Sequence, residues 1–297
     1  MPTAPANADG IEIAYETYGD PADVPLLFVM GLGAQLQAWD VEFVQAFVDR
    51  GFYAIRYDNR DVGLSTKPDV GQISVTERIL AFYGGSSVEA PYLLADMAAD
   101  AIGLLDHLGI EAAHVVGASM GGMIAQTVAI VYPSRVLSLT SIMSTTGDRD
   151  VGQARPDVAA VLLQRPPADR DGAIAQGIAT SRAIGSPEHF DEERARIRAT
   201  TAYDRCFYPA GIGNQLLAIL ASGSRTEALR HLAVPTLVIH GDEDPLVGPS
   251  GGERTAEAIP GAELLVIEGM GHDLPPVFWP QIVEHITSLA SRATASA

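Results

Sequence analysis

The sequence predicts an α/β fold in which helices cover both faces of a mostly parallel central sheet. Short apolar runs rich in β-branched residues alternate along the chain with helical patterns. Runs of this kind are typical of strands buried on both faces. Strands that alternate with helices favour parallel pairing, because the helix carries the chain back along the sheet. One long, purely helical stretch interrupts the alternation.

The individual elements follow from the spacing of the apolar residues. Residues 10–18 alternate apolar and polar side chains, which predicts a strand near a sheet edge. Residues 93–108 place apolar side chains three to four positions apart, and Gly109 ends this predicted helix. The other strands are predicted over 26–30, 52–57, 113–117, 136–142, 234–240 and 264–267, and the other helices over 120–131 and 277–291.

The helical stretch, residues 146–225, is predicted to be an insertion into a single core domain. It contains no buried-strand run, and breaks such as Arg165-Pro166-Pro167 separate its helical patterns. Residues 1–145 and 226–297 then form the α/β core, and the insertion forms a lid over the site. A structural embellishment with no role at the site is the alternative. The helices of the insertion are predicted over 157–163, 170–184, 191–203 and 212–221.

The composition is that of a folded globular protein with an acidic surface. Hydrophobic residues make up 47% of the chain and charged residues 19%, with a formal net charge of −18. Such a surface repels phosphate backbones and anionic lipid head groups, so neither nucleic acid nor a membrane is expected as a partner. The simplest reason for the acidity is solubility.

Cysteine content and apolar run lengths bear on the compartment. The single cysteine, Cys206, allows no intramolecular disulfide and no cysteine-based metal site. The N-terminus lacks the basic and apolar blocks of a signal peptide. No stretch approaches the roughly 18–20 consecutive apolar residues of a membrane span. We therefore expect a soluble cytoplasmic protein, and the sequence does not indicate its oligomeric state.

The run Gly117-Ala118-Ser119-Met120-Gly121 indicates a nucleophilic serine. It places Gly-x-Ser-x-Gly directly after an apolar strand and before a helix. The tight turn that projects such a serine needs the two glycines, because a Cβ at either position would clash across the turn. The N–H groups at the start of the helix can stabilise a developing oxyanion. An ordinary turn serine is the alternative.

A serine hydroxyl needs a general base, and the position of His272 makes it the candidate. His272 lies near the C-terminus, after the strand predicted over 264–267 and before a helix. The glycines in Gly269-Met270-Gly271-His272 permit a loop that brings the imidazole back over the sheet. A structural role is the default for a single histidine, and only its position sets His272 apart.

The acid that orients the histidine should follow a strand between the serine and the histidine. The strand predicted over 234–240 is such a strand, and several carboxylates follow it. Asp244 is the preferred acid, because the preceding turn lets its side chain reach the histidine. Asp242 is the second choice and Asp148, which follows the strand at 136–142, is the third. Each could instead be a turn or cap aspartate.

The loop after the strand at 26–30 is expected to supply an oxyanion hole. Met30-Gly31-Leu32-Gly33 occupies this loop, and its glycines leave the backbone exposed. The backbone N–H groups of Leu32 and Met120 would then be the two donors, and loss of one such donor typically costs ~10²–10³ in rate. A dinucleotide-binding fingerprint is not indicated, because the third glycine is missing.

These motifs together resemble the α/β-hydrolase superfamily over nearly the whole chain. Within it, the sequence is similar to the small esterases that include aclacinomycin methylesterase. Many relatives begin the oxyanion loop with His-Gly, whereas this chain has Met30-Gly31. The motifs that carry the resemblance are Met-Gly-Leu-Gly (30–33), Arg-Tyr-Asp-Asn-Arg-Asp-Val-Gly-Leu-Ser (56–65), Gly-Ala-Ser-Met-Gly (117–121), Val-Pro-Thr-Leu-Val-Ile-His-Gly-Asp-Glu-Asp-Pro (234–245) and Gly-Met-Gly-His (269–272).

The resemblance implies a serine carboxylesterase that works through an acyl-enzyme, with Ser119, Asp244 and His272 at the matching positions. It implies no metal and no organic cofactor, and the substrate is a small molecule, an ester or a lactone. A fairly apolar substrate of small to medium size is expected. Aromatic side chains that could line its pocket, although such residues more often belong to a core, are Phe82, Tyr83, Tyr203, Phe207, Tyr208 and Trp279.

Three alternatives to a linear-ester hydrolase stay open. The first is a lactonase of the acyl-homoserine lactone or enol-lactone type, which uses the same site on a cyclic ester. The second is a cofactor-free haloperoxidase side activity, because such enzymes carry the same triad. The third is a ligand-binding protein on a hydrolase fold, against which the intact triad and oxyanion loop weigh.

Overall fold

The computed structural model describes residues 1–6, 10–71, 73–158, 167 and 169–295. Within this part of the chain the strands form one eight-stranded sheet in the order β1-β2-β4-β3-β5-β6-β7-β8. The first two pairings, β1 with β2 and β2 with β4, are antiparallel, and the others are parallel. The strands are β1 (Thr3–Pro5), β2 (Glu12–Tyr18), β3 (Val24–Val29), β4 (Phe52–Tyr57), β5 (Ala113–Ala118), β6 (Val136–Ile142), β7 (Thr236–Gly241) and β8 (Glu263–Ile267).

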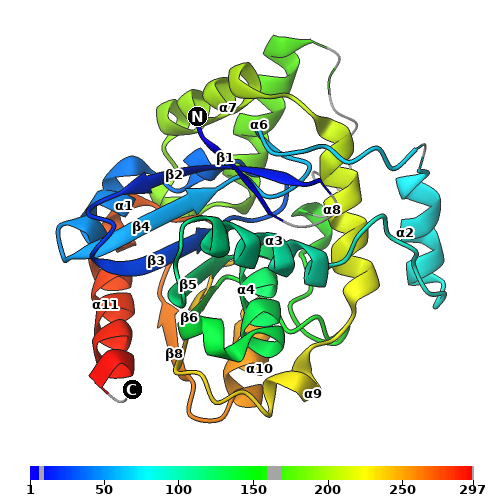
Figure 1. Ribbon diagram of the computed structural model, residues 1–297. Coiled ribbons are helices and arrows are strands. Elements are labelled where there is room, and N and C mark those ends of the chain that lie inside the picture. Colours follow the sequence, from blue (N-terminus) through cyan, green and yellow to red (C-terminus); the bar gives the residue numbers. More distant parts are fainter. Residues whose placement is uncertain (7–9, 72, 159–166, 168, 296–297) are drawn as a thin grey trace.

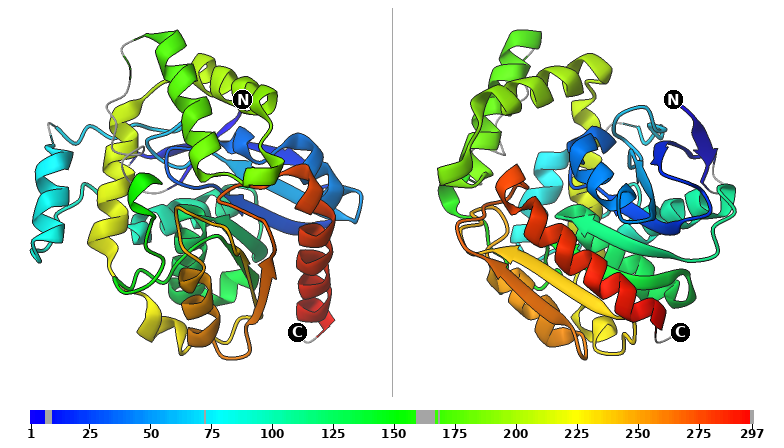
Figure 2. Two further views of the ribbon diagram at one scale, coloured as in Figure 1. Left: turned by 180° about the vertical axis from the view of Figure 1, so that it is seen from behind. Right: turned by 90° about the vertical axis from the view of Figure 1, so that its left-hand side faces the viewer.

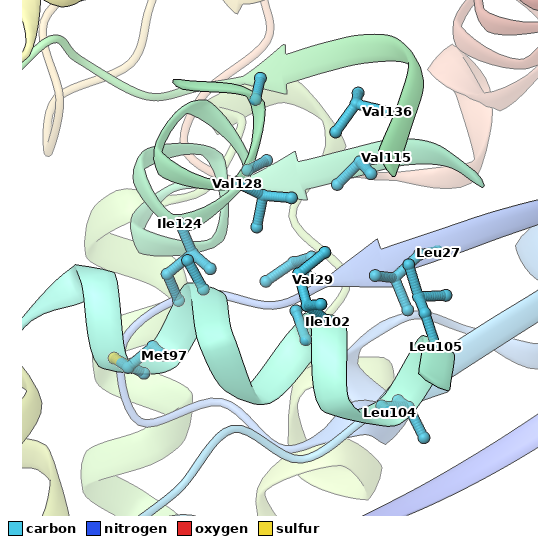
Figure 3. Packing of buried hydrophobic residues seen from close by; sticks show 14 of the residues in the cluster. Leu27, Val29, Met97, Ile102, Leu104, Leu105, Val115, Ile124, Val128 and Val136 are labelled. Atoms are coloured by element: carbon cyan, nitrogen blue, oxygen red, sulfur yellow. The ribbon is translucent and has the colours of Figure 1, made fainter. Parts of the chain in front are cut away.

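Helices cover both faces of this sheet, as the short apolar runs predict. Successive side chains of a strand point to opposite faces. On β3, Leu27 and Val29 therefore join one buried cluster, with α3 (Leu94–His107) and α4 (Met120–Val131), shown in Figure 3. Leu26 and Phe28 join a second cluster on the other face, with α1 (Val41–Val48) and α11 (Trp279–Ala295). Figure 2 shows α11 lying along this second face.

Between β6 and β7 the described residues form helices and no strand. Figure 1 shows α6 (Arg170–Ile184) and α7 (Glu192–Arg205) packed together beyond the sheet, while α8 (Pro209–Ser222) runs past the ends of the central strands. These three helices correspond to those predicted over 170–184, 191–203 and 212–221. The helix predicted over 157–163 lies largely outside the described residues. Further α-helices among the described residues are α2 (Val75–Tyr83), α9 (Thr226–Leu229) and α10 (Ser250–Ala258).

The predicted fold class is confirmed, with one correction to the burial of the strands. The run at 264–267 is not buried on both faces, because β8 is the last strand of the sheet. Leu264 is 41% exposed and Val266 47%. An apolar run at a sheet edge has the same sequence pattern as a central one. The strand predicted over 10–18 is the second from the other edge, where the unpredicted strand β1 pairs with it.

A buried histidine on β5 makes the stability of the fold depend on pH. His114 is almost fully buried, and burial lowers its pKa from 6.5 to about 4. Because the unfolded chain binds the proton more readily, the free energy of unfolding falls as the pH drops from 6.5 towards 4. We expect His114 to contribute a loss of about 2 kcal/mol between pH 7 and pH 5.

Urea denaturation at pH 7 and pH 5 checks this prediction. Between pH 7 and pH 5, the free energy of unfolding should fall by about 2 kcal/mol more in the wild type than in His114→Gln, because the glutamine side chain takes up no proton in this range. The difference between the two proteins removes the contribution of the other histidines. An equal loss in both proteins would contradict the assignment to His114.

Candidate active site

Ser119 lies in the turn between β5 and α4 and has a strained backbone. Its φ is 57° and its ψ −123°, a conformation that residues with a Cβ rarely adopt. The turn is tight on both sides. A Cβ on Gly117 would lie 2.1 Å from the carbonyl oxygen of Gly121, and one on Gly121 would lie 2.1 Å from that of Val29. The two glycines of Gly-x-Ser-x-Gly are thus required by the packing of the turn.

Ser119, His272 and Asp244 form a continuous chain of hydrogen bonds. The His272 Nε2 atom lies 2.9 Å from Ser119 Oγ, and the Nδ1 atom lies 2.7 Å from Asp244 Oδ2. An ionised carboxylate only accepts hydrogen bonds, so Nδ1 carries the proton and donates it to Asp244. Nε2 is then free to accept the hydroxyl proton of Ser119. This is the arrangement that activates a serine for attack on a carbonyl.

Asp244 is fully enclosed yet held in its ionised form. Burial alone would raise its pKa, but the charge of His272 and the hydrogen bonds from His240 and His272 outweigh burial and lower the pKa to about 2. The other oxygen, Oδ1, accepts the backbone N–H groups of Leu246 and Val247, each at 2.9 Å. The carboxylate therefore stays charged at any working pH and has little freedom to rotate.

His240, at the end of β7, is a buried second histidine beside this carboxylate. Its Nε2 atom lies 2.7 Å from the carbonyl oxygen of Val247 and 3.4 Å from Asp244 Oδ2. Because a carbonyl oxygen only accepts, Nε2 carries a proton that faces both oxygens. His240 was not among the residues predicted for the site. Its position directly before the Gly241-Asp242 turn is the signal that could have identified it.

The two alternative acids are bound elsewhere. Asp242 accepts the backbone N–H of Gly269 at 2.7 Å and is exposed, so it caps the turn that precedes the histidine loop. Asp148 lies 2.6 Å from Arg254 and also accepts the hydroxyl groups of Ser224 and Thr226. Both carboxylates therefore have structural partners, and neither bonds to His272.

The loop after β3 lies directly against the serine. A Cβ on Gly31 would lie 3.0 Å from the Cβ atom of Ser119, so the backbone of this loop approaches the serine closely. Among the described residues, no hydrogen-bond acceptor is found for the backbone N–H of Leu32 or of Met120. Met120 is the first residue of α4, where N–H groups have no partner within the helix. These two N–H groups are thus available to an oxyanion.

Side chains from distant parts of the chain hold this loop in place. Asn59 Nδ2 donates to the carbonyl oxygen of Met30 at 2.9 Å. Gln215 of α8 accepts the backbone N–H of Gly33 at 2.8 Å and donates to the carbonyl oxygen of Arg60 at 2.8 Å. Gln215 is fully buried. Nothing in the helical pattern at 212–221 had marked it as a residue of the site.

Asp58, in the motif at 56–65, has a structural role. Its carboxylate accepts the backbone N–H groups of Leu36 and Leu64, each at 2.8 Å, and forms a 2.6 Å ion pair with Arg205. It is completely buried. Asp58 thus links the loop after β3 to the end of α7.

A cavity of about 250 Å³ has one of the predicted aromatic residues, Phe82, in its wall, whereas Ser119, His272 and Asp244 do not line it. Its wall includes Met123, one helical turn after the serine on α4, and Phe82 from α2. Tyr83, by contrast, is 79% exposed, and neither it nor the other predicted aromatic residues line this cavity. The rest of the wall is formed by Thr145, Gly147, Asp148, Arg149, Ile219, Leu220, Gly223, Ser224 and Arg225.

The described residues contain neither a candidate metal-binding cluster nor a candidate membrane-spanning helix. No group of three or more His, Cys, Asp or Glu side chains that could hold a metal ion is found within the described residues. Among the described helices, none combines the length and the apolar character that a membrane-spanning segment requires.

The fold and the Ser-His-Asp arrangement are those of a serine hydrolase, and the chain belongs to the α/β hydrolase fold family. The model of this family matches residues 24–276. The chain is 31% identical to rhodomycin D methylesterase DnrP from Streptomyces peucetius, over 93% of each chain. It is 27% identical to 3-oxoadipate enol-lactonase 2 from Acinetobacter baylyi, over 94% of this chain and 92% of the relative.

A solved structure supports the same fold. The enol-lactonase from Burkholderia xenovorans LB400 superposes with a TM-score of 0.73 and 20% identity, over 98% of this chain and 100% of that one. The family match and the methylesterase relative support the predicted class of activity, which is hydrolysis of a carboxylic ester.

Proposed function

We propose that this enzyme hydrolyses the methyl ester of a small to medium-sized, fairly apolar carboxylic acid through an acyl-enzyme on Ser119. The hydrogen-bond chain from Ser119 through His272 to a buried, ionised Asp244 carries this proposal. The resemblance to a rhodomycin D methylesterase favours a methyl ester over other esters.

The chemistry proceeds in two halves. The Ser119 hydroxyl oxygen attacks the ester carbonyl while His272 Nε2 takes its proton, and Asp244 stabilises the imidazolium. The carbonyl oxygen becomes an oxyanion, which accepts hydrogen bonds from the N–H groups of Leu32 and Met120. The bond between the carbonyl carbon and the methoxy oxygen then breaks while His272 gives its proton to that oxygen. Methanol leaves, and the acyl group stays on Ser119. A water molecule repeats the sequence, which releases the acid and restores the serine.

A lactonase is the second candidate, because an enol-lactonase is also among the relatives. A lactone is a cyclic ester, so the same attack opens the ring, and the alcohol produced remains attached to the acyl group. The two candidates differ only in what the pocket admits. For either substrate we propose a cytoplasmic enzyme, which a chain with a single cysteine suits.

Proton release measured by pH-stat on a substrate panel tests the proposal. The panel holds methyl, ethyl and butyl esters of the same apolar acids, together with five-membered lactones. We expect the methyl esters to be hydrolysed best, with kcat in the usual range of ~1–10³ s⁻¹. Preference for the lactones would favour the second candidate. Saturable binding of the panel without any turnover would overturn both and favour a ligand-binding protein.

A further inference from the structure

Ser186 is a buried residue of the helical insertion that lies beside the histidine loop. It follows the end of α6 and precedes the short 3₁₀ turn Pro187–His189. Its side chain is fully buried, although the three residues that follow it, 187–189, are exposed. A buried hydroxyl needs hydrogen-bond partners, and those of Ser186 belong to the loop that carries His272.

Ser186 bonds to the residues on both sides of His272. Its Oγ atom accepts the backbone N–H of Gly271 at 2.9 Å. The hydroxyl of Ser186 donates to Asp273 Oδ1 at 2.6 Å, and its backbone N–H donates to the same oxygen at 2.9 Å. The two hydroxyl bonds use the donor and one acceptor position of a single oxygen. One buried side chain thus connects Gly271 and Asp273.

The main chain of His272 itself is held by the same part of the insertion. Its N–H donates to the carbonyl oxygen of Ile184 at 2.7 Å. The two loops touch backbone to backbone, because a Cβ on Gly271 would lie 2.5 Å from the carbonyl carbon of Gly185. Three successive residues of the histidine loop are therefore bound to the end of α6.

We propose that Ser186 is a positioning residue for His272, an inference that rests on the proposed function of the site. The imidazole must keep hydrogen bonds to Ser119 and Asp244 at the same time, so a small shift of its backbone breaks one of them. A displacement of about 1 Å can cost about 10²-fold in rate. At this end, the predicted lid (146–225) is a fixed part of the catalytic apparatus.

Ser186→Ala tests the proposal with p-nitrophenyl acetate as the probe. The variant keeps the backbone N–H bond to Asp273 but loses both hydroxyl bonds. We expect kcat to fall about tenfold or more, while KM stays within about threefold, because Ser186 does not contact the substrate. The low-field NMR signal of the His272 Nδ1 proton, which reports its bond to Asp244, should shift or broaden.

Asp273→Ala removes the other end of the same connection. If the two residues act together, Asp273→Ala should give the same kcat loss and NMR change, and the double variant should be little worse than either single one. Fully additive losses would overturn the proposal. If Ser186→Ala does not fold, kcat and the His272 Nδ1 proton signal are measured in Asp273→Ala instead. Wild-type values for kcat and for that signal would overturn the proposal.

Ser222→Ala is the matched control. The Ser222 hydroxyl also anchors the insertion to the core, because it accepts the N–H of Leu94 at 3.0 Å and donates to the carbonyl oxygen of Ala218 at 2.7 Å. It does so away from His272, so stability should fall while kcat and the NMR signal stay at wild-type values. Equal kcat losses in Ser222→Ala and Ser186→Ala would mean general loosening and would overturn the proposal.

Failure of the positioning role of Ser186 can be distinguished from failure of the proposed function. If Ser119→Ala abolishes turnover while Ser186→Ala matches the wild type in kcat and NMR signal, only the positioning role is wrong. If Ser119→Ala keeps full turnover, the proposed function itself fails and the positioning role fails with it.

Discussion

Ser119→Ala is expected to reduce kcat/KM for the best ester by at least about 10³-fold and up to about 10⁶-fold. Removing the hydroxyl removes the oxygen that lies 2.9 Å from His272 Nε2. The oxyanion donors and the pocket remain, so binding of substrate should persist. Initial rates over a range of substrate concentrations, with kcat and KM fitted separately, provide the measurement.

The fold of Ser119→Ala should be unchanged, which makes the kinetic result interpretable. Alanine keeps the Cβ of serine, so the strained backbone with φ of 57° is neither relieved nor worsened. Thermal unfolding followed by circular dichroism should therefore give nearly the same midpoint for both proteins. Full activity in a folded Ser119→Ala protein would mean that another group attacks the ester.

Asp244→Asn is expected to lower kcat by about 10⁴-fold, close to the effect of losing the nucleophile. An amide can present its NH₂ group to His272 Nδ1, which would then act as acceptor and leave the proton on Nε2. In that tautomer Nε2 cannot take the proton of Ser119. The charge that stabilises the imidazolium is lost as well. The kcat of Asp244→Asn at pH 7 and 8 provides the measurement.

Asp242→Asn and Asp148→Asn are the matched controls for this loss. In Asp242→Asn, the amide oxygen can still accept the N–H of Gly269. In Asp148→Asn, the ion pair with Arg254 and one of the two hydroxyl hydrogen bonds weaken. Both should keep kcat within about threefold of the wild type, since neither bonds to His272. A loss of about 10⁴-fold in either control, with Asp244→Asn active, would show that the acid had been misassigned.

Local patterns in the sequence predicted the fold and the groups that form the hydrogen-bond chain. The apolar runs over β3, β5 and β7 are typical of strands that are covered on both faces, and the residues of these strands are mostly buried. Ser119 is marked by the glycines of its turn, because close packing excludes any other residue there. His272 and Asp244 followed from chain order and from their positions after strands. For each of these residues, the decisive information lies within a few neighbours along the chain.

The residues that hold the site in place could not be predicted in this way. Ser186 and Gly271 are 85 residues apart in sequence, and Gln215 and Gly33 are 182 apart. Only the folded chain brings such pairs together, and a serine or glutamine in a helical region has no local feature that marks it.

The exposure of β8, at one edge of the sheet, could not be predicted from the sequence either. Leu264 and Val266 are as apolar as residues of the central strands, yet they are largely exposed because β8 has a neighbour on one side only. Burial depends on the order of the strands in the sheet. The sequence pattern of a single strand does not contain that order.

Labelling with a p-nitrophenyl alkylphosphonate, read by intact mass and peptide mapping, is the most direct test of the central claim. The phosphonate phosphorus is attacked by an activated serine and leaves a stable adduct that mimics the tetrahedral intermediate. We expect one equivalent of nitrophenol to be released and one phosphonyl group per chain to be attached, on Ser119. An adduct on a different residue, or active enzyme that resists labelling altogether, would contradict that claim.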